Sequence, residues 1–158
     1  MLALAAVSSA QSPFDGTWKV DLNSTRLPEI PNVIVLQNGT FVCSSCNPDV
    51  NIKADGTDQS LQGNNAFDTM AIRILNDTSF ERTNKKNEKI VSVAKNIVSK
   101  DGRTRTVDFT QYPAASKEPV IGRNMFIRVA AGPAGSHALS GSWRTQKVAV
   151  SKNAITGH

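Results

Sequence analysis

Apolar and polar residues alternate along most of the chain with the two-residue period of a β-strand. In residues 68–75, Met70, Ile72 and Ile74 occupy every second position, so a strand would place all three on one face. No long stretch has the apolar spacing of an amphipathic helix, although a single helical turn is an alternative within residues 28–31 or 114–117. The strands expected from this pattern are residues 14–22, 33–36, 40–43, 50–53, 68–75, 78–83, 89–99, 104–110, 122–130 and 142–150.

Turn residues separate these strands, most of them at intervals of roughly ten residues. Asn38-Gly39 offers two residues that tolerate a positive φ, which is typical of a two-residue hairpin, and Lys100-Asp101-Gly102 is the clearest other turn. Strands joined by tight turns pair with their sequence neighbours, and such a sheet removes its exposed edges by closing. The sequence therefore predicts an all-β fold, an antiparallel up-and-down β-barrel, with a β-sandwich as the alternative.

The interior of such a barrel is the candidate ligand-binding site. An interior lined by apolar side chains binds a small apolar or amphipathic ligand if a cavity remains, and is a solid core if those side chains fill it. The residues expected to face inward are Met70, Ile72, Ile74, Val91, Val93, Phe109 and Phe126.

Composition and charge indicate a globular chain of about one domain. The 158 residues are 39% hydrophobic and 20% charged, which excludes an intrinsically disordered chain. No apolar run approaches the roughly 20 residues that cross a bilayer, so no transmembrane segment is expected. The formal net charge of +5 is concentrated in residues 85–89 and 100–105, at opposite ends of one strand. Because only Phe109 and Tyr112 lie near these clusters, we interpret them as solvated surface and expect no nucleic-acid partner.

The first ten residues have the pattern of the end of a secretory leader. The apolar run Leu-Ala-Leu-Ala-Ala-Val is followed by Ser-Ser-Ala, which suits cleavage near Ala10 or Gln11. No basic residue precedes the run, and an ordinary apolar terminus is the alternative. We expect residues 1–11 to be a signal-peptide remnant, residues 12–158 to form a single β-barrel domain, and the protein to be secreted or periplasmic.

A Gly-x-Trp motif begins the first strand of this expected domain. Phe14-Asp15-Gly16-Thr17-Trp18-Lys19 resembles the opening of lipocalins and related calycins, and it is similar to the opening of small exported bacterial proteins of unknown function. The resemblance implies a lipocalin-like barrel in which Trp18 closes one end of the core. It further implies that an arginine of a late strand, Arg128 or Arg144, packs across the Trp18 ring.

The same motif occurs again near the end of the chain. Leu139-Ser140-Gly141-Ser142-Trp143-Arg144 repeats the earlier order of apolar, polar, glycine, hydroxyl, tryptophan and basic residues. We expect Trp143, like Trp18, to have a structural role. Residues 139–158 are either the closing strand of one barrel or the start of a truncated second repeat.

Cys43 and Cys46 are the only cysteines. Asn47 follows the pair where a haem-attachment motif needs histidine, and neither a second cysteine pair nor a following helix is available for zinc binding or thioredoxin-like redox chemistry. In an exported protein the spacing favours a local disulfide across a tight turn. A redox-active pair and free thiols or a metal site are the alternatives.

Candidate catalytic residues are few. His137 lies in a glycine-rich loop, and the carboxylates Asp55, Asp58 and Asp68 flank turns, where aspartate commonly bonds nearby amides. We expect no cofactor and no metal. The sequence thus favours a non-catalytic barrel that binds a small ligand; the alternatives are a structural or interaction module of the cell envelope with a filled barrel and, third, an enzyme of the hydrolase or isomerase type.

Overall fold

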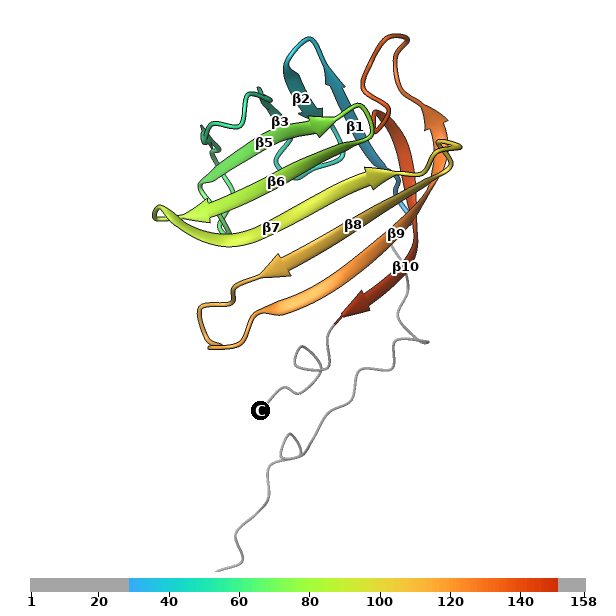
Figure 1. Ribbon diagram of the computed structural model, residues 1–158. Helices are drawn as coiled ribbons and strands as arrows, with labels where there is room; N and C mark the ends of the chain where they lie inside the picture. Colours follow the sequence, from blue (N-terminus) through green and yellow to red (C-terminus); the bar gives the residue numbers. More distant parts are fainter. Residues whose placement is uncertain (1–28, 151–158) are drawn as a thin grey trace, which may run out of the picture.

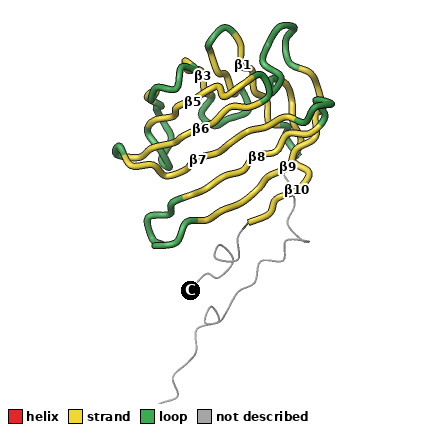
Figure 2. The backbone as a smooth tube through the Cα atoms, in the orientation of Figure 1, coloured by secondary structure: helices red, strands yellow, loops and turns green. Residues whose placement is uncertain are grey.

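The computed structural model describes residues 29–150, which form β-strands and no helix (Figures 1 and 2). It confirms the all-β prediction. The predicted strand at residues 14–22 lies outside the described residues, and residues 114–117 form a turn instead of the helical turn considered from the sequence. The strands are β1 (Asn32–Gln37), β2 (Thr40–Cys43), β3 (Val50–Lys53), β4 (Gln59–Ser60), β5 (Thr69–Asn76), β6 (Ser79–Lys86), β7 (Lys89–Val98), β8 (Thr104–Gln111), β9 (Val120–Ala131) and β10 (Gly141–Val150).

These strands make one antiparallel sheet in the order β3-β2-β1-β10-β9-β8-β7-β6-β5-β4. The run from β4 to β10 follows the chain, and β1 then pairs with β10 through Asn32 opposite Trp143 and Ile34 opposite Gly141. The sheet curls until its two ends approach each other, where the amide of Gly56, after β3, donates to the carbonyl of Ile72 on β5 at 2.8 Å. The result is the predicted up-and-down barrel, nearly closed.

The β1–β2 hairpin shows how local sequence sets the strand register. Asn38 and Gly39 have φ values of 52° and 69°, the left-handed conformation that both residues accept. The tight turn places Gln37 opposite Thr40 and Ile34 opposite Cys43. This register puts the alternate apolar residues of both strands on the inner face.

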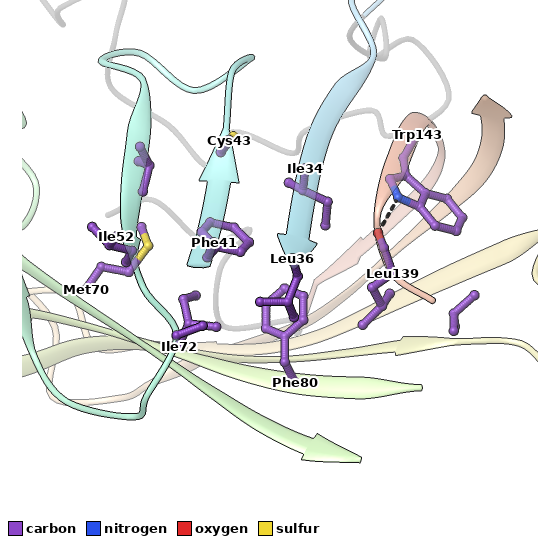
Figure 3. Close-up of a cluster of buried hydrophobic side chains, with 13 residues drawn as sticks. Ile34, Leu36, Phe41, Cys43, Ile52, Met70, Ile72, Phe80, Leu139 and Trp143 are labelled. Carbon is purple, nitrogen blue, oxygen red and sulfur yellow. Dashed lines mark hydrogen bonds between the residues drawn. The ribbon is translucent and has the colours of Figure 1, made fainter. Parts of the chain in front are cut away.

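One part of the barrel interior is a solid apolar core (Figure 3). The rings of Phe41 on β2 and Phe80 on β6 meet edge to face, with centroids 5.6 Å apart, so the β1–β3 segment packs directly against β5 and β6. The core residues are Ile34, Leu36, Phe41, Cys43, Val50, Ile52, Ala54, Met70, Ile72, Phe80, Val98, Leu139 and Trp143.

Polar side chains replace apolar ones at inner positions of β6, β7 and β8. Asn84, Asn96 and Arg105 are each less than 7% exposed. Such burial requires hydrogen-bond partners, and the partners of Arg105 define the site described next.

Candidate functional site

A pocket of about 500 Å³ lies where this polar part of the interior meets the start of β1. Strands β6, β8, β9 and β10 supply most of its wall, and the residues before β1 and the loop after β2 complete it. Its lining includes Asn32, Arg82, Arg105, Val107, Asn124 and Phe126.

Strand alternation and register place these side chains together. On β8, Arg105 and Val107 are two residues apart and both are buried, so both point inward. Phe126 of β9 lies opposite Arg105, and Asn124 lies opposite Val107. Arg82 lies opposite the small Ala94 of the intervening strand β7, which leaves room for the long arginine side chain.

An irregularity in β10 adds two more side chains to the pocket. Thr145 and Val148 both line it although they are three residues apart, a spacing that would put them on opposite faces of a regular strand. The register of β10 with β9 shifts between Thr145 and Lys147, so one extra residue is accommodated. The bulge therefore turns Val148 to the same side as Thr145.

The Arg105 guanidinium is held by neutral amides. Its Nε and Nη2 donate to Asn96 Oδ1 at 3.0 and 2.7 Å, and its Nη1 donates to Asn32 Oδ1 at 2.6 Å. The guanidinium also lies over the Phe126 ring, 4.9 Å from the ring centre. These contacts use three of the five N–H donors of the guanidinium and fix its orientation, but none of them supplies a negative charge.

Arg82, the other arginine of the pocket, is held by fewer contacts than Arg105. Its Nε is shielded from solvent and has no hydrogen-bond partner among the described residues. Burial lowers the pKa of Arg82, and burial together with the nearby charge of Arg82 lowers the pKa of Arg105 to about 9. The three ion pairs within residues 29–150 join other residues, so neither arginine has a carboxylate partner there.

The disulfide loop supports the pocket from outside. Cys43 and Cys46 form the predicted disulfide, and the described residues contain no free cysteine. Within this loop, Ser45 Oγ accepts hydrogen bonds from the Val33 amide at 2.8 Å and from Asn32 Nδ2 at 3.1 Å. Since Asn32 Oδ1 in turn accepts from Arg105, the loop helps to position the guanidinium.

The predicted interior residues do not all meet in one place. Met70 and Ile72 are buried in the solid core (Figure 3), and Ile74, farther along β5, is 43% exposed. Phe126 lines the pocket, while Phe109, on the same face of β8 as Val107, covers Gly122 of β9 outside it.

Val93 lies on the opposite face of the sheet from the pocket, and Val91 is the extra residue where the register of β7 with β6 shifts. On β7 the buried residues are Ala94, Asn96 and Val98, and Val93 shares its face with the exposed Lys95. The inward face expected for Val93 was wrong: on this strand small and amide side chains point inward.

Sequence reasoning missed both pocket arginines. Arg105 was included in the basic cluster 100–105 and interpreted as solvated, whereas it is 6% exposed. Its alternation with Val107 and Phe109 is the signal that could have found it, and Arg82 has the same two-residue spacing from the buried Phe80. Net charge alone gave no reason to look inside the barrel.

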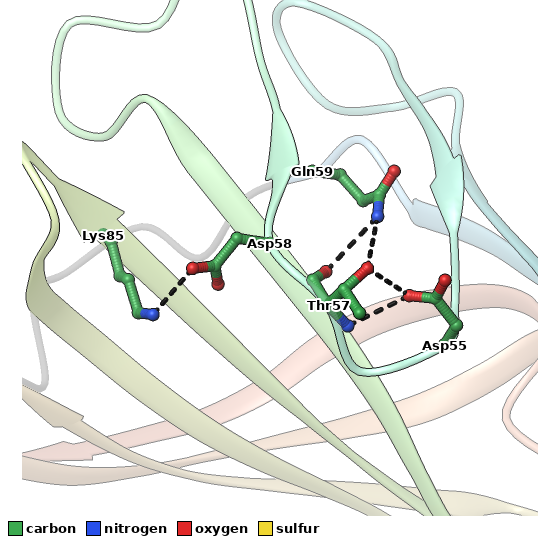
Figure 4. A network of polar contacts seen from close by, with 5 residues as sticks. All are labelled: Asp55, Thr57, Asp58, Gln59 and Lys85. Atoms are coloured by element: carbon green, nitrogen blue, oxygen red, sulfur yellow. Dashed lines mark hydrogen bonds and ion pairs between the residues drawn. The ribbon is translucent and has the colours of Figure 1, made fainter.

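A second, larger pocket of about 710 Å³ lies among the loops around β4 and is strongly polar. Three of its charged groups have partners: Lys85 Nζ donates to Asp58 Oδ2 at 2.7 Å, a pair drawn in Figure 4, and Asp68 accepts from the Asn87 amide at 2.9 Å. Beside it, Asp55 accepts from the hydroxyl and amide of Thr57, which lowers the Asp55 pKa. These contacts stabilise turns, and the described residues contain no cluster suited to a metal ion.

The second Gly-x-Trp motif has a structural role in the barrel. Trp143 is fully buried, its Nε1 donates to Leu139 O at 3.0 Å, and the Arg128 guanidinium lies 4.1 Å from its ring centre. Gly141 has a φ of 139°, and a Cβ there would lie 2.4 Å from Ala130 O, which explains the glycine. Since β10 pairs with both β1 and β9, this strand is a member of the barrel.

The expected arginine stack therefore occurs on the second tryptophan. Arg128 covers Trp143, whereas Arg144 is exposed on the outer face of β10. Trp18, on which the stack was expected, lies outside the described residues.

His137 is also used structurally. Its Nδ1 accepts from the Leu139 amide at 3.2 Å, which leaves Nε2–H to donate to Asn76 O at 2.7 Å. Nδ1 thus holds the β9–β10 loop in shape, and Nε2 ties this loop to the end of β5. Neither Asp55 nor Asp68 is among the contacts of this ring.

Comparisons with protein-family models, with curated proteins and with solved structures give no match for this chain. Residues 29–150 contain no helix that is long and apolar enough to cross a membrane. The pocket must therefore be interpreted from its own chemistry.

Proposed function

We propose that this protein is an exported, non-catalytic β-barrel that binds a small amphipathic ligand in the pocket beside Arg105. The observation that carries the proposal is the pocket of about 500 Å³, because small-ligand sites typically measure about 300–1,000 Å³. The Cys43–Cys46 disulfide supports a secreted or periplasmic location, since disulfides persist in oxidising compartments.

The composition of the wall supports an amphipathic ligand. Phe126, Val107 and Val148 form an apolar surface, and Asn124 and the arginines face the same space. A ligand with an apolar body would bury that body against the first surface and direct its polar group to the second. The lipocalin-like resemblance of the sequence supports such a binding role.

A structural module of the cell envelope is the second candidate. The observation that favours it is the solid packing between β1–β3 and β5–β6, where Phe41, Phe80 and Ile72 fill the interior (Figure 3). In this case the pocket would be a solvated hollow beside a structural core.

A neutral solvatochromic dye separates the two candidates, because its fluorescence rises when it leaves water for an apolar site. We expect saturable binding by the wild-type protein and a loss of at least about tenfold in affinity in Val148→Phe, which fills the pocket. Ala149→Phe is the matched control, since Ala149 is exposed on the outer face of the same strand. Absence of dye binding, or equal binding by both variants, would favour the structural module.

A further inference from the structure

We propose that the ligand of this pocket carries an organic carboxylate, and that the guanidinium groups of Arg82 and Arg105 bind it. This inference rests on the proposed function and names the chemical class of the ligand's polar group. It follows from the charges inside the barrel, their hydrogen bonds and the adjoining apolar wall.

The first step is the uncompensated positive charge. Two arginines that face the same pocket from β6 and β8 have no ion-pair partner among the described residues. Buried charges are normally paired, because removal from water without an opposite charge is costly. A bound anion would supply the charge that the protein itself does not supply here.

The second step is the state of the donors. Arg105 is already oriented by Asn96 and Asn32, so its plane is fixed before a ligand arrives. Arg82 has a buried Nε with no acceptor, and that donor belongs to a side chain that lines the pocket. The site therefore combines a preorganised guanidinium with one whose Nε lacks an acceptor, and both are donors suited to an anion.

The third step concerns the shape of the anion. A guanidinium binds a carboxylate through paired, coplanar hydrogen bonds. Phe126 lies under Arg105, and Val107 and Val148 continue the apolar surface from that point. A carboxylate at the end of an apolar body would match both surfaces at once. Asn124 Oδ1, which is buried without a donor, would accept a hydrogen bond from a hydroxyl or amide group of the same ligand.

Decanoate and 1-decanol provide the test, because they share a ten-carbon chain and differ in the charge of one end. We expect decanoate to displace the neutral dye, or to bind in calorimetry, at least about tenfold more tightly than decanol at pH 7.5. Arg82→Gln and Arg105→Gln should each remove most of this preference. Arg144→Gln, a change to an exposed arginine on the outer face, should leave it intact.

Thermal unfolding of each variant shows whether a loss of binding comes from the site or from a loss of folded structure. Arg82→Gln removes a half-buried charge that has no ion-pair partner within residues 29–150, so we expect it to melt at or above the wild-type temperature without ligand and to lose the stabilisation that decanoate gives to the wild type. Equal binding of decanoate and decanol, or a preference that survives in both glutamine variants, would overturn the carboxylate assignment and leave ligand binding standing. If neither compound nor the dye binds, the proposed function fails and the assignment with it.

Discussion

Arg128→Ala tests the structural role of the second Gly-x-Trp motif. Arg128 Nε, Nη1 and Nη2 donate to the carbonyls of Gly102, Ser140 and Ala138, each at 2.6 Å, and the guanidinium covers Trp143. One side chain thus joins the β7–β8 turn, the β9–β10 loop and the buried indole. Truncation to alanine removes all of these contacts at once.

The expected cost follows from those contacts. A hydrogen bond from a charged donor contributes about 1.5–3 kcal/mol when fully buried, and a stacked cation contributes about 0.5–2 kcal/mol. Two effects reduce the expected loss. Arg128 is partly exposed, so water replaces part of each hydrogen bond after truncation. Burial also lowers the Arg128 pKa, which reflects a modest cost of holding the charged guanidinium there. We therefore expect the free energy of unfolding to fall by about 3 kcal/mol.

Urea unfolding measures this loss as a lower midpoint at unchanged slope. Arg128→Lys, which keeps the charge but cannot reach three carbonyls, should recover less than half of the loss. Arg144→Ala is the control, since Arg144 is exposed on the outer face of β10, and it should change stability by less than about 0.5 kcal/mol. If Arg128→Ala were no more destabilising than Arg144→Ala, the stack and the three hydrogen bonds would not hold this end of the barrel together.

Three further predictions concern the core, the disulfide and the pocket. Ile72→Ala removes a side chain that is 0% exposed and should lower the free energy of unfolding by about 3 kcal/mol. Ile74→Ala changes a half-exposed side chain and should lower it by less than about 1 kcal/mol. Equal losses of stability in urea titrations would contradict the placement of the core. Replacing Cys43 and Cys46 together with serine should cost about 2 kcal/mol through loop entropy, and an unchanged urea midpoint would refute this. The affinity for decanoate should stay constant from about pH 6 to 9 and should fall above pH 9 by up to about tenfold per pH unit. The reason is that the Arg105 pKa is about 9 and an anion binds only the protonated guanidinium. If calorimetry showed a constant affinity up to about pH 10.5, Arg105 would be excluded from the site.

The sign of the pH effect follows from the groups around Arg105. Arg82 faces it from β6, and its other neighbours, Asn96, Asn32 and Phe126, carry no charge. Burial and Arg82 both disfavour the charged guanidinium, so the ligand-free pKa is lowered. A bound carboxylate favours the charged form and raises that pKa, so binding above about pH 9 takes up a proton and weakens as the pH rises.

Most of the fold was predictable because strand periodicity and turn chemistry are local properties. Asn38-Gly39 and Gly102 adopt the positive φ values that their turns require, and the strands from residue 33 onward agree with the alternation of apolar residues. The pairing of β1 with β10 was not predictable in detail, since it joins residues about 110 positions apart through backbone hydrogen bonds that carry no sequence signal. The two-residue strand β4 was missed because it is too short to show a period.

The site was predicted less well, for a physical reason. Alternation identifies which residues share a face but does not say which face is inside when both carry apolar side chains. On β7 the valines Val91 and Val93 were the stronger apolar signal, yet Ala94 and Asn96 point inward, where Ala94 lies opposite Arg82 and Asn96 accepts hydrogen bonds from Arg105. A buried arginine cannot be distinguished from a surface arginine by composition, and only the register of β6, β7 and β8 brings the two arginines to one pocket.

Native mass spectrometry of the protein purified from its own host tests the central claim most directly. We expect wild-type protein to carry one small molecule per chain, which fragments as an organic acid with an apolar body and is absent from Arg82→Gln protein prepared in the same way. Wild-type protein that carries no small molecule, and that takes up neither decanoate nor the neutral dye when these are added, would contradict the claim that this barrel is a ligand-binding protein.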